Sequence, residues 1–176
     1  MEKTRRFGRA MVVLAILFFV STAVVSAQTL DGKWFVMNCQ VHAYAVDSTS
    51  GDFVICNFPF QAYIYFSYNG PFGTHGAGYD YQIWCQTTPG HWEMTANTSR
   101  YSVSISENFF EDWWMGLYTK DGANVNTYIT PYVNAVANKF KAGGEIYYGS
   151  DAKGRTLFGW LTINGKTVSH PPFPVE

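Results

Sequence analysis

Apolar and polar residues alternate along most of the chain after residue 32. The clearest case is the segment from Lys33 to Val46, in which one set of alternate positions is entirely apolar and the other is mixed. The apolar set is Phe35, Met37, Cys39, Val41, Ala43 and Ala45, and the mixed set is Trp34, Val36, Asn38, Gln40, His42 and Tyr44. Successive side chains of a β-strand point to opposite faces of a sheet, so this period of two predicts a long strand with one dry face.

Shorter segments with the same alternation follow at near-regular spacing. They span residues 53–58, 61–68, 79–87, 91–96, 101–106, 112–119, 124–129, 145–148 and 155–163. Turn residues separate them, for example in Pro89-Gly90 and in Lys120-Asp121-Gly122. Such a series predicts a meandering antiparallel sheet.

The expected architecture is a sheet that closes or folds on itself, because an open sheet of about nine strands would expose long edges. The fold class predicted is therefore all-β, as an antiparallel up-and-down barrel or as a sandwich. A sandwich strand would have one dry and one clearly charged face, whereas the second faces here carry Trp, Tyr, Asn, Gln and His with few charges. This composition favours the barrel.

One segment departs from the period of two. Thr130 can cap a helix, Pro131 suits a first helical position, and Gly143-Gly144 can end the helix. The apolar residues between them fall at helical spacing: Val133, Val136, Ala137 and Phe140. The sequence therefore predicts one short amphipathic helix near residues 131–142.

The first 27 residues have the organisation of a secretory signal. A basic start precedes an apolar run from Ala10 to Val25, and Val25-Ser26-Ala27 places small residues at a cleavage site. The apolar run is shorter than the roughly 20 residues that a membrane-spanning helix needs. We therefore expect a cleavable signal peptide at 1–27 and a single β-rich domain at 28–176, secreted or periplasmic, with no stable membrane insertion after cleavage.

Removal of the leader changes the charge of the chain. The whole sequence has 12 Lys and Arg against 13 Asp and Glu, and the leader holds four of the former and one of the latter. The mature domain thus carries a net charge of about −4, which argues against nucleic acid as a partner. Export in the unfolded state favours a protein without a preloaded cofactor.

Three cysteines, at positions 39, 56 and 85, allow three single disulfides in an oxidising compartment. The stretch from Asp47 to Asp52 is rich in turn residues, so the chain is expected to fold back there and to bring Cys39 near Cys56. This pairing is favoured over a pairing with Cys85. Cys85 would then be a buried free thiol.

The segment Leu30-Asp31-Gly32-Lys33-Trp34 resembles the G-x-W motif that opens the first strand of lipocalins and the wider calycin group. The resemblance implies that Trp34 plugs the closed end of an up-and-down barrel beside a basic residue of the last strands, for which Arg155 is the candidate. Tyr79-Asp80-Tyr81 looks like the family's T-D-Y turn. Asp80 lies only about fifty residues after Gly32, and the expected helix precedes the last hairpin, which departs from the family pattern.

The sequence offers little catalytic chemistry. It lacks the G-x-S-x-G and H-E-x-x-H motifs. His91 and Glu93 share a face of a predicted strand and are weak candidates for an acid and a base, or for metal ligands together with His42 or His75. Polar residues on a solvated strand are the favoured interpretation, so no metal site is expected.

The aromatic residues carry the functional hypotheses. The ligand-binding candidates lie mostly opposite the dry face: Tyr44, Tyr65, Tyr81, Trp114 and Tyr118. The first hypothesis is a barrel that binds a small, partly apolar ligand without catalysis. The alternatives are a carbohydrate-binding or adhesive module on a β-sandwich, and a small-barrel isomerase or hydrolase. The partner expected is thus a small molecule or a glycan, and nothing in the sequence indicates an oligomeric state.

Overall fold

The computed structural model describes residues 30–47, 49–72, 76–104, 113–129, 131–134 and 138–175. The expected signal peptide at 1–27 and His75 lie outside these residues. The described part of the chain contains β-strands and no α-helix. The strands are β1 (Lys33–Val46), β2 (Phe53–Phe72), β3 (Gly76–Thr88), β4 (His91–Ser104), β5 (Trp113–Tyr118), β6 (Asn124–Ile129), β7 (Tyr132–Asn134), β8 (Lys139–Ser150) and β9 (Thr156–Val168).

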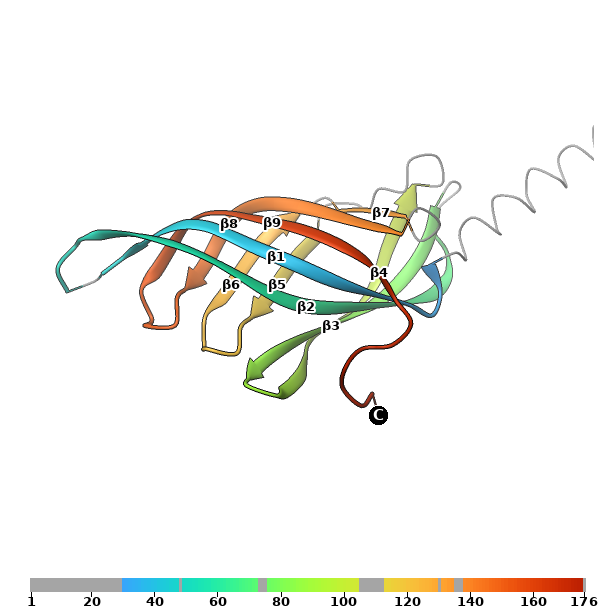
Figure 1. Cartoon of the computed structure of the whole chain (residues 1–176). Coiled ribbons are helices and arrows are strands. Elements are labelled where there is room, and N and C mark those ends of the chain that lie inside the picture. The colour runs from blue at the N-terminus through green and yellow to red at the C-terminus, as the bar shows by residue number, and fades with distance from the viewer. Residues whose placement is uncertain are drawn as a thin grey trace, which may run out of the picture.

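The strands form a nearly closed antiparallel barrel (Figure 1). Their order in the sheet is β4-β3-β2-β1-β9-β8-β6-β5, and β7 pairs with β8 beside this path. β1 and β9 are paired along their whole length, from Trp34 opposite Val168 to Val46 opposite Thr156. At the other side of the barrel β5 lies against β3 and β4. The prediction of an up-and-down barrel is thus confirmed, with the first and last strands as neighbours.

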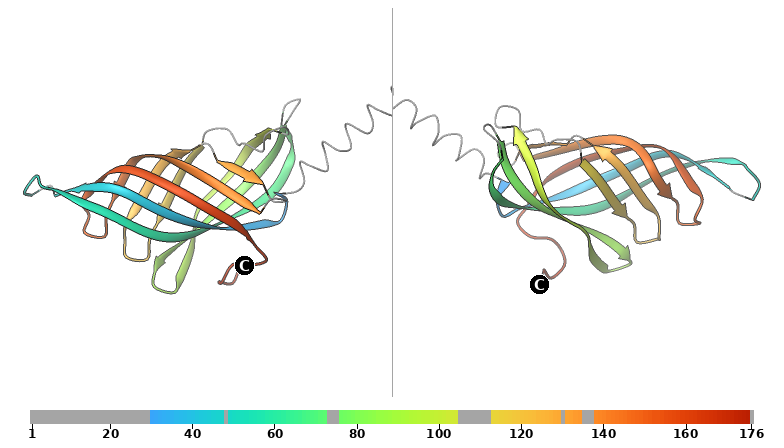
Figure 2. Two further views of the ribbon diagram at one scale, coloured as in Figure 1. Left: turned by 45° about the horizontal axis from the view of Figure 1, so that its top comes forward. Right: turned by 180° about the vertical axis from the view of Figure 1, so that it is seen from behind.

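Four hairpins turn at the same end of the barrel (Figure 2). Each contains a glycine with positive φ, at positions 51, 90, 122 and 154. A residue with a side chain is strained in that backbone conformation, so glycine is favoured at these sites. The turns that the sequence predicts at these four places are confirmed.

The predicted helix at 131–142 is wrong. Residues 132–134 form β7, and 139–142 form the start of β8, with Val133 opposite Phe140. Both of these side chains are fully buried in the barrel. Asn138 has a φ of 53°, which suits the turn of a hairpin and is incompatible with a continuous helix. A hairpin therefore buries the same apolar pair that a helix would have placed on one face.

Several strands are longer than the sequence indicates. β2 runs through Pro59, where the alternation predicted a stop, and β4 joins the two segments expected at 91–96 and 101–106. Pro59 is tolerated because β2 has a paired neighbour on one side only at that position, and an edge strand can lose an N–H. β9 continues beyond the segment expected at 155–163, because Asn164-Gly165-Lys166, a combination typical of turns, lies inside the strand.

The barrel interior is a dry core. The apolar face predicted for β1 is confirmed, because its six residues from Phe35 to Ala45 are all buried. The end of the barrel opposite the four hairpins is filled by contacts among aromatic rings: Phe35, Phe66, Tyr79 and Phe140. Each large side chain buried in this way contributes roughly 1.5–3 kcal/mol to folding.

Candidate functional site: a cavity along the free edge of β2

The first nine residues of β2, 53–61, form a strand edge. They pair with β1 on one side, whereas the pairing of β2 with β3 begins only at Ala62 opposite Cys85. Beyond Cys85, β3 continues in its hairpin with β4 and leaves β2. Among the described residues no strand takes its place, and the hairpin of β1 and β2 extends past the neighbouring hairpins (Figure 1).

A cavity of about 600 Å³ lies beside this edge and is open to solvent. We call it the edge cavity. Its lining comes from β1, β2, β9, the hairpin of β3 and β4, and the turn between β5 and β6: Asn38, Cys39, Gln40, Phe58, Pro59, Phe60, Gln61, Gln86, Trp92, Thr119, Lys120, Asp121 and Asn164. Its volume falls within the range of small-ligand sites.

The near wall of the edge cavity combines aromatic rings and amides. Phe58 and Phe60 point to the inner side of the sheet, and their ring centroids are 6.2 Å apart. On the outer side, Gln61 Nε2 donates a hydrogen bond of 2.9 Å to Asn38 Oδ1. This wall therefore offers apolar contact and hydrogen-bonding groups without a charged side chain.

The far wall is the turn between β5 and β6, and it is held by local hydrogen bonds. The Thr119 hydroxyl donates to Asp121 Oδ1 at 2.5 Å and accepts from the backbone N–H of Ala123 at 3.0 Å. The backbone N–H groups of Thr119 and Gly122 donate to the carbonyls of Ala123 and Thr119. Because these bonds fix the turn, Lys120 and Asp121 form a preorganised charged rim.

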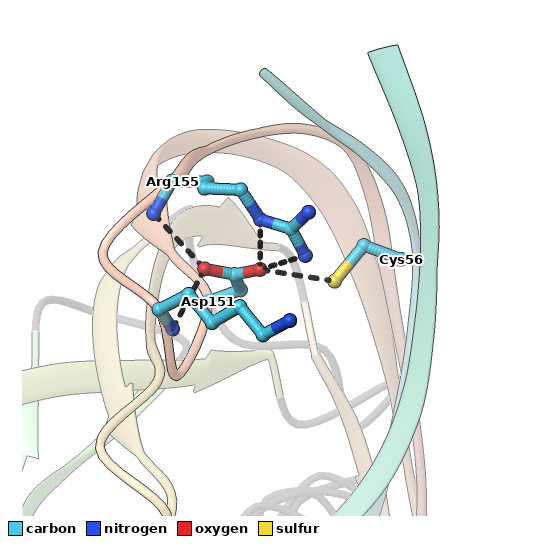
Figure 3. Close-up of polar contacts among 4 residues, drawn as sticks. Cys56, Asp151 and Arg155 are labelled. Carbon is cyan, nitrogen blue, oxygen red and sulfur yellow. Dashed lines mark hydrogen bonds and ion pairs between the residues drawn. The ribbon is translucent and has the colours of Figure 1, made fainter. Parts of the chain in front are cut away.

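An ion pair joins the buried Asp151 to the partly buried Arg155, and it contacts Cys56 of β2 (Figure 3). Asp151 Oδ2 accepts from Arg155 Nε at 2.7 Å, and Oδ1 accepts from the backbone N–H groups of Lys153 and Arg155 at 2.9 Å each. Burial raises the pKa of Asp151, but the hydrogen bonds from Arg155 and Lys153 outweigh it and lower the pKa below its usual value. The carboxylate therefore organises the turn between β8 and β9.

Cys56 connects this turn to β2. Its thiol donates to Asp151 Oδ2 at 3.9 Å, and it lies two residues from Phe58 on the same strand. Burial, followed by the negative charge of Asp151, raises the pKa of the Cys56 thiol. Burial likewise raises the pKa values of Cys39 and Cys85. All three side chains are therefore held as thiols and are poor nucleophiles.

The expected disulfide between Cys39 and Cys56 is not formed, and all three cysteines are free. The register of β1 and β2 explains this correction, because it places Cys39 opposite Phe60 and Cys56 opposite Ala43. Four positions along a strand separate the two Cα atoms by about 13 Å, beyond the reach of a disulfide. Cys85 is a buried thiol, as expected.

A second aromatic cluster lies on the outside of the barrel. Here the C-terminal tail folds back over β1–β4, and Phe173 stacks on Trp92 and Trp84 at centroid distances of 4.8 and 5.1 Å. Trp34 and Tyr63 contact the same ring edge to face. Trp92 belongs both to this cluster and to the lining of the edge cavity, so the docked tail supports one of the cavity walls.

Trp34 lies near the start of β1, and Arg155 lies beside the other end of this strand. Trp34 lies opposite Val168, whereas Arg155 directly precedes Thr156, which lies opposite Val46. Twelve strand positions correspond to about 40 Å. Trp34 packs against Tyr65 and Phe173 outside the barrel, and the ion-pair partner of Arg155 is Asp151.

The five aromatic candidates for ligand binding do not meet in one pocket. Tyr81 is buried in the barrel core, whereas Tyr44, Tyr65, Trp114 and Tyr118 lie on the outer surface. None of the five lines the edge cavity. For Tyr44, Tyr65, Trp114 and Tyr118, the mixed strand face is the outside of a filled barrel, whereas Tyr81 is part of the filling.

Trp114 belongs to an exposed group that we call the tyrosine patch: Trp114, Tyr128, Tyr147 and Tyr148. The three tyrosines are 58%, 66% and 64% exposed, in that order. A register irregularity between β6 and β8 lets the consecutive Tyr147 and Tyr148 both lie on the surface. The ring contacts are mostly edge to face, with Trp114 and Tyr128 4.7 Å apart.

His91 and Glu93 contact each other, but in an open position. His91 Nε2 and Glu93 Oε1 are 2.8 Å apart, and the side chains are 62% and 54% exposed. Neither residue lines the edge cavity, and His42 lies on the outer face of β1. In the described ranges, no three His, Cys, Asp or Glu residues lie close enough together to hold a metal ion.

Sequence reasoning missed the phenylalanines at the edge cavity. The alternation predicts a short strand that ends at Phe58, and it leaves Phe60 in the gap that follows Pro59. Proline inside an alternating run is a sign of an edge strand, and it could have marked 53–61 as an open edge.

Comparisons of the chain with protein-family models, with curated proteins and with solved structures find no match. Within the described part of the chain, no helix has the length and apolar character required to span a membrane. The geometry of the edge cavity and of the outer aromatic residues is therefore the evidence for function.

Proposed function

We propose that the protein is an exported β-barrel that binds a small, partly apolar ligand in the edge cavity, without catalysis. The observation that carries this proposal is the cavity of about 600 Å³ with Phe58 and Phe60 on one wall. Apolar walls with a few fixed polar groups are typical of small-ligand sites. The organisation of residues 1–27 supports export.

The chemistry of the lining supports binding over catalysis. The cavity contains one thiol, Cys39, whose pKa is raised by burial, and one lysine and one aspartate on the rim. Thr119 donates its hydroxyl proton to Asp121 within the turn. These groups can orient a ligand through hydrogen bonds and charge, while the phenylalanines supply most of the contact energy.

The test is binding of N-phenyl-1-naphthylamine, a small, uncharged aromatic probe whose fluorescence rises in apolar surroundings. The double variant Phe58→Ala/Phe60→Ala should bind the probe about tenfold more weakly, because it loses roughly 1–2 kcal/mol of apolar contact. Phe158→Ala is the matched control, since Phe158 is exposed on β9 and does not line the cavity. Equal affinity in the wild type and the double variant would refute this site, provided that both are folded by circular dichroism.

A second candidate function is glycan binding or adhesion through the tyrosine patch. Large exposed aromatic groups on a soluble surface commonly mark interaction sites, and sugar rings present C–H groups that stack on aromatic faces. On β9, the exposed Phe158 lies opposite the exposed Tyr44 of β1, so further aromatic side chains are present on the outer surface.

A glycan array tests this candidate. Binding to a defined glycan should fall by about tenfold or more in Tyr147→Ala/Tyr148→Ala, because each lost ring contact is worth roughly 0.5–1.5 kcal/mol. Phe53→Ala removes an equally exposed ring at the hairpin of β1 and β2 and should leave binding unchanged. An array on which the wild type binds no glycan would contradict this function.

A further inference from the structure

We propose that the edge cavity takes an extended peptide, which pairs with residues 53–61 of β2 as an added strand. This inference names the ligand class for the site proposed above and rests on that site. It follows from the backbone of β2, from the shape of the cavity, and from the composition of the edge.

The backbone provides the first argument. A strand inside a sheet forms hydrogen bonds with two neighbours, but within the described residues the segment 53–61 has only β1. Its other side therefore presents a row of N–H and C=O groups, with the N–H of Pro59 missing. Such a row is the recognition element in peptide binding by strand addition, where main-chain bonds supply affinity.

The shape of the cavity provides the second argument. Four consecutive residues of β2, from Phe58 to Gln61, line it. Because alternate residues point to opposite faces of a sheet, a ligand on one face would contact only every second residue. Consecutive residues of β1, from Asn38 to Gln40, also line the cavity although β1 is paired on both sides, so it is the position of Phe58 to Gln61 within the stretch of β2 that lacks a second partner that places the cavity at the edge. An added strand would place alternate side chains against Phe60 on the inner side and against Gln61 and Trp92 on the outer side.

The composition of the edge indicates the kind of peptide. Residues 53–61 contain no charged side chain, and Phe53 and Ile55 are largely exposed. A long, uncharged, apolar edge is a site of association, so an extended partner with apolar residues at alternate positions would complement it. The turn at Lys120 and Asp121 also lines the cavity, so the space beside the edge is bounded by another part of the barrel. A single peptide strand therefore fits better than the edge of a second barrel.

The probe peptide is acetyl-Val-His-Ala-Tyr-Ala-Val-amide, the sequence of residues 41–46. This sequence already pairs antiparallel with residues 53–58 on the other side of β2. A fluorescent form is titrated with the full mature protein, beside a hexapeptide library with apolar residues at alternate positions. Two further forms of each binding peptide carry N-methyl groups at positions 1, 3 and 5 or at positions 2, 4 and 6.

Strand addition predicts that only one of the two methylation patterns weakens binding. Methylation of the amides that face β2 should weaken binding by roughly a hundredfold, since three hydrogen bonds are lost, and the other pattern should change it little. Bound peptide should also slow hydrogen exchange at alternate amides of residues 53–61. An equal loss from both patterns, or protection confined to other strands, would overturn the proposal.

The same measurements separate this proposal from the proposed function. If N-phenyl-1-naphthylamine binds and depends on Phe58 and Phe60, but neither the probe peptide nor the library binds, the peptide proposal fails and the small-ligand site stands. If neither the probe nor any peptide binds, both proposals fail.

Discussion

Replacing Gly159 by alanine is expected to prevent stable closure of the barrel between β1 and β9. A Cβ atom at this position would lie 2.2 Å from the His42 carbonyl oxygen, 2.5 Å from Ala43 Cα and 2.8 Å from Ala43 Cβ. β1 is paired on both sides, so its backbone cannot move away without loss of pairing with β2 or β9. We expect a loss of about 3 kcal/mol or more, which is a large part of the stability of a typical domain.

Chemical denaturation followed by circular dichroism measures this effect. Gly116→Ala is the matched control, because its Cβ would meet only the Asn126 side chain, with Oδ1 at 2.9 Å, and that flexible amide can turn away. The control should unfold within about 1 kcal/mol of the wild type. A Gly159→Ala protein that unfolds at the same denaturant concentration as the wild type would contradict the register of β1 and β9.

Much of the barrel could be predicted because its signals are local. The bounds of β1 and β6 agree with the segments read from the alternation, at 33–46 and 124–129. The four hairpin turns contain glycine beside other turn residues, and those residues act within a few positions of each other. The period of two and the turn residues therefore determine which consecutive strands form hairpins, whereas the pairing of β1 with β9 joins the two ends of the chain.

The helix and the disulfide could not be derived from local signals in the same way. Val133 and Phe140 meet both on one face of a helix and across a tight hairpin, so only the neighbouring strands decide between the two structures. The turn between Cys39 and Cys56 lies where the sequence predicts it, but the register of the hairpin keeps the two cysteines apart. Cys39 lies eight residues before Asp47, whereas Cys56 lies four residues after Asp52, so a regular hairpin cannot pair them.

The site was missed for two physical reasons. The mixed strand faces suggest a pocket, but the interior is filled by the apolar faces, and the mixed faces form the outer surface. The edge cavity exists because β3 leaves β2 after Cys85, and the length over which two strands stay paired depends on the whole sheet. The alternation of apolar and polar residues carries no information about the residue at which β3 separates from β2.

Replacing Asp151 by alanine is expected to be the second most damaging change. The side chain is only 7% exposed, and the variant would leave Arg155 and two backbone N–H groups of the turn without their acceptor. We expect a loss of roughly 2–3 kcal/mol at neutral pH, because partners left unsatisfied by such a truncation are costly. Asp151→Asn keeps the shape but loses the charge, so its loss should be smaller. Exposed Asp52, at the neighbouring turn, provides the control Asp52→Ala.

The pH dependence of the unfolding free energy separates the contribution of the Asp151 charge from the contribution of its packing. Because the folded state lowers the pKa of Asp151, the carboxylate contributes its full stability above the unfolded pKa of about 4. That contribution is lost as the pH falls through the lowered pKa of the folded state. Urea unfolding at pH 7 and near pH 3 should therefore show a smaller decrease in Asp151→Asn than in the wild type. If both lose the same unfolding free energy between these two pH values, another carboxylate causes the acid sensitivity, and the ion pair with Arg155 contributes little to the stability of the turn.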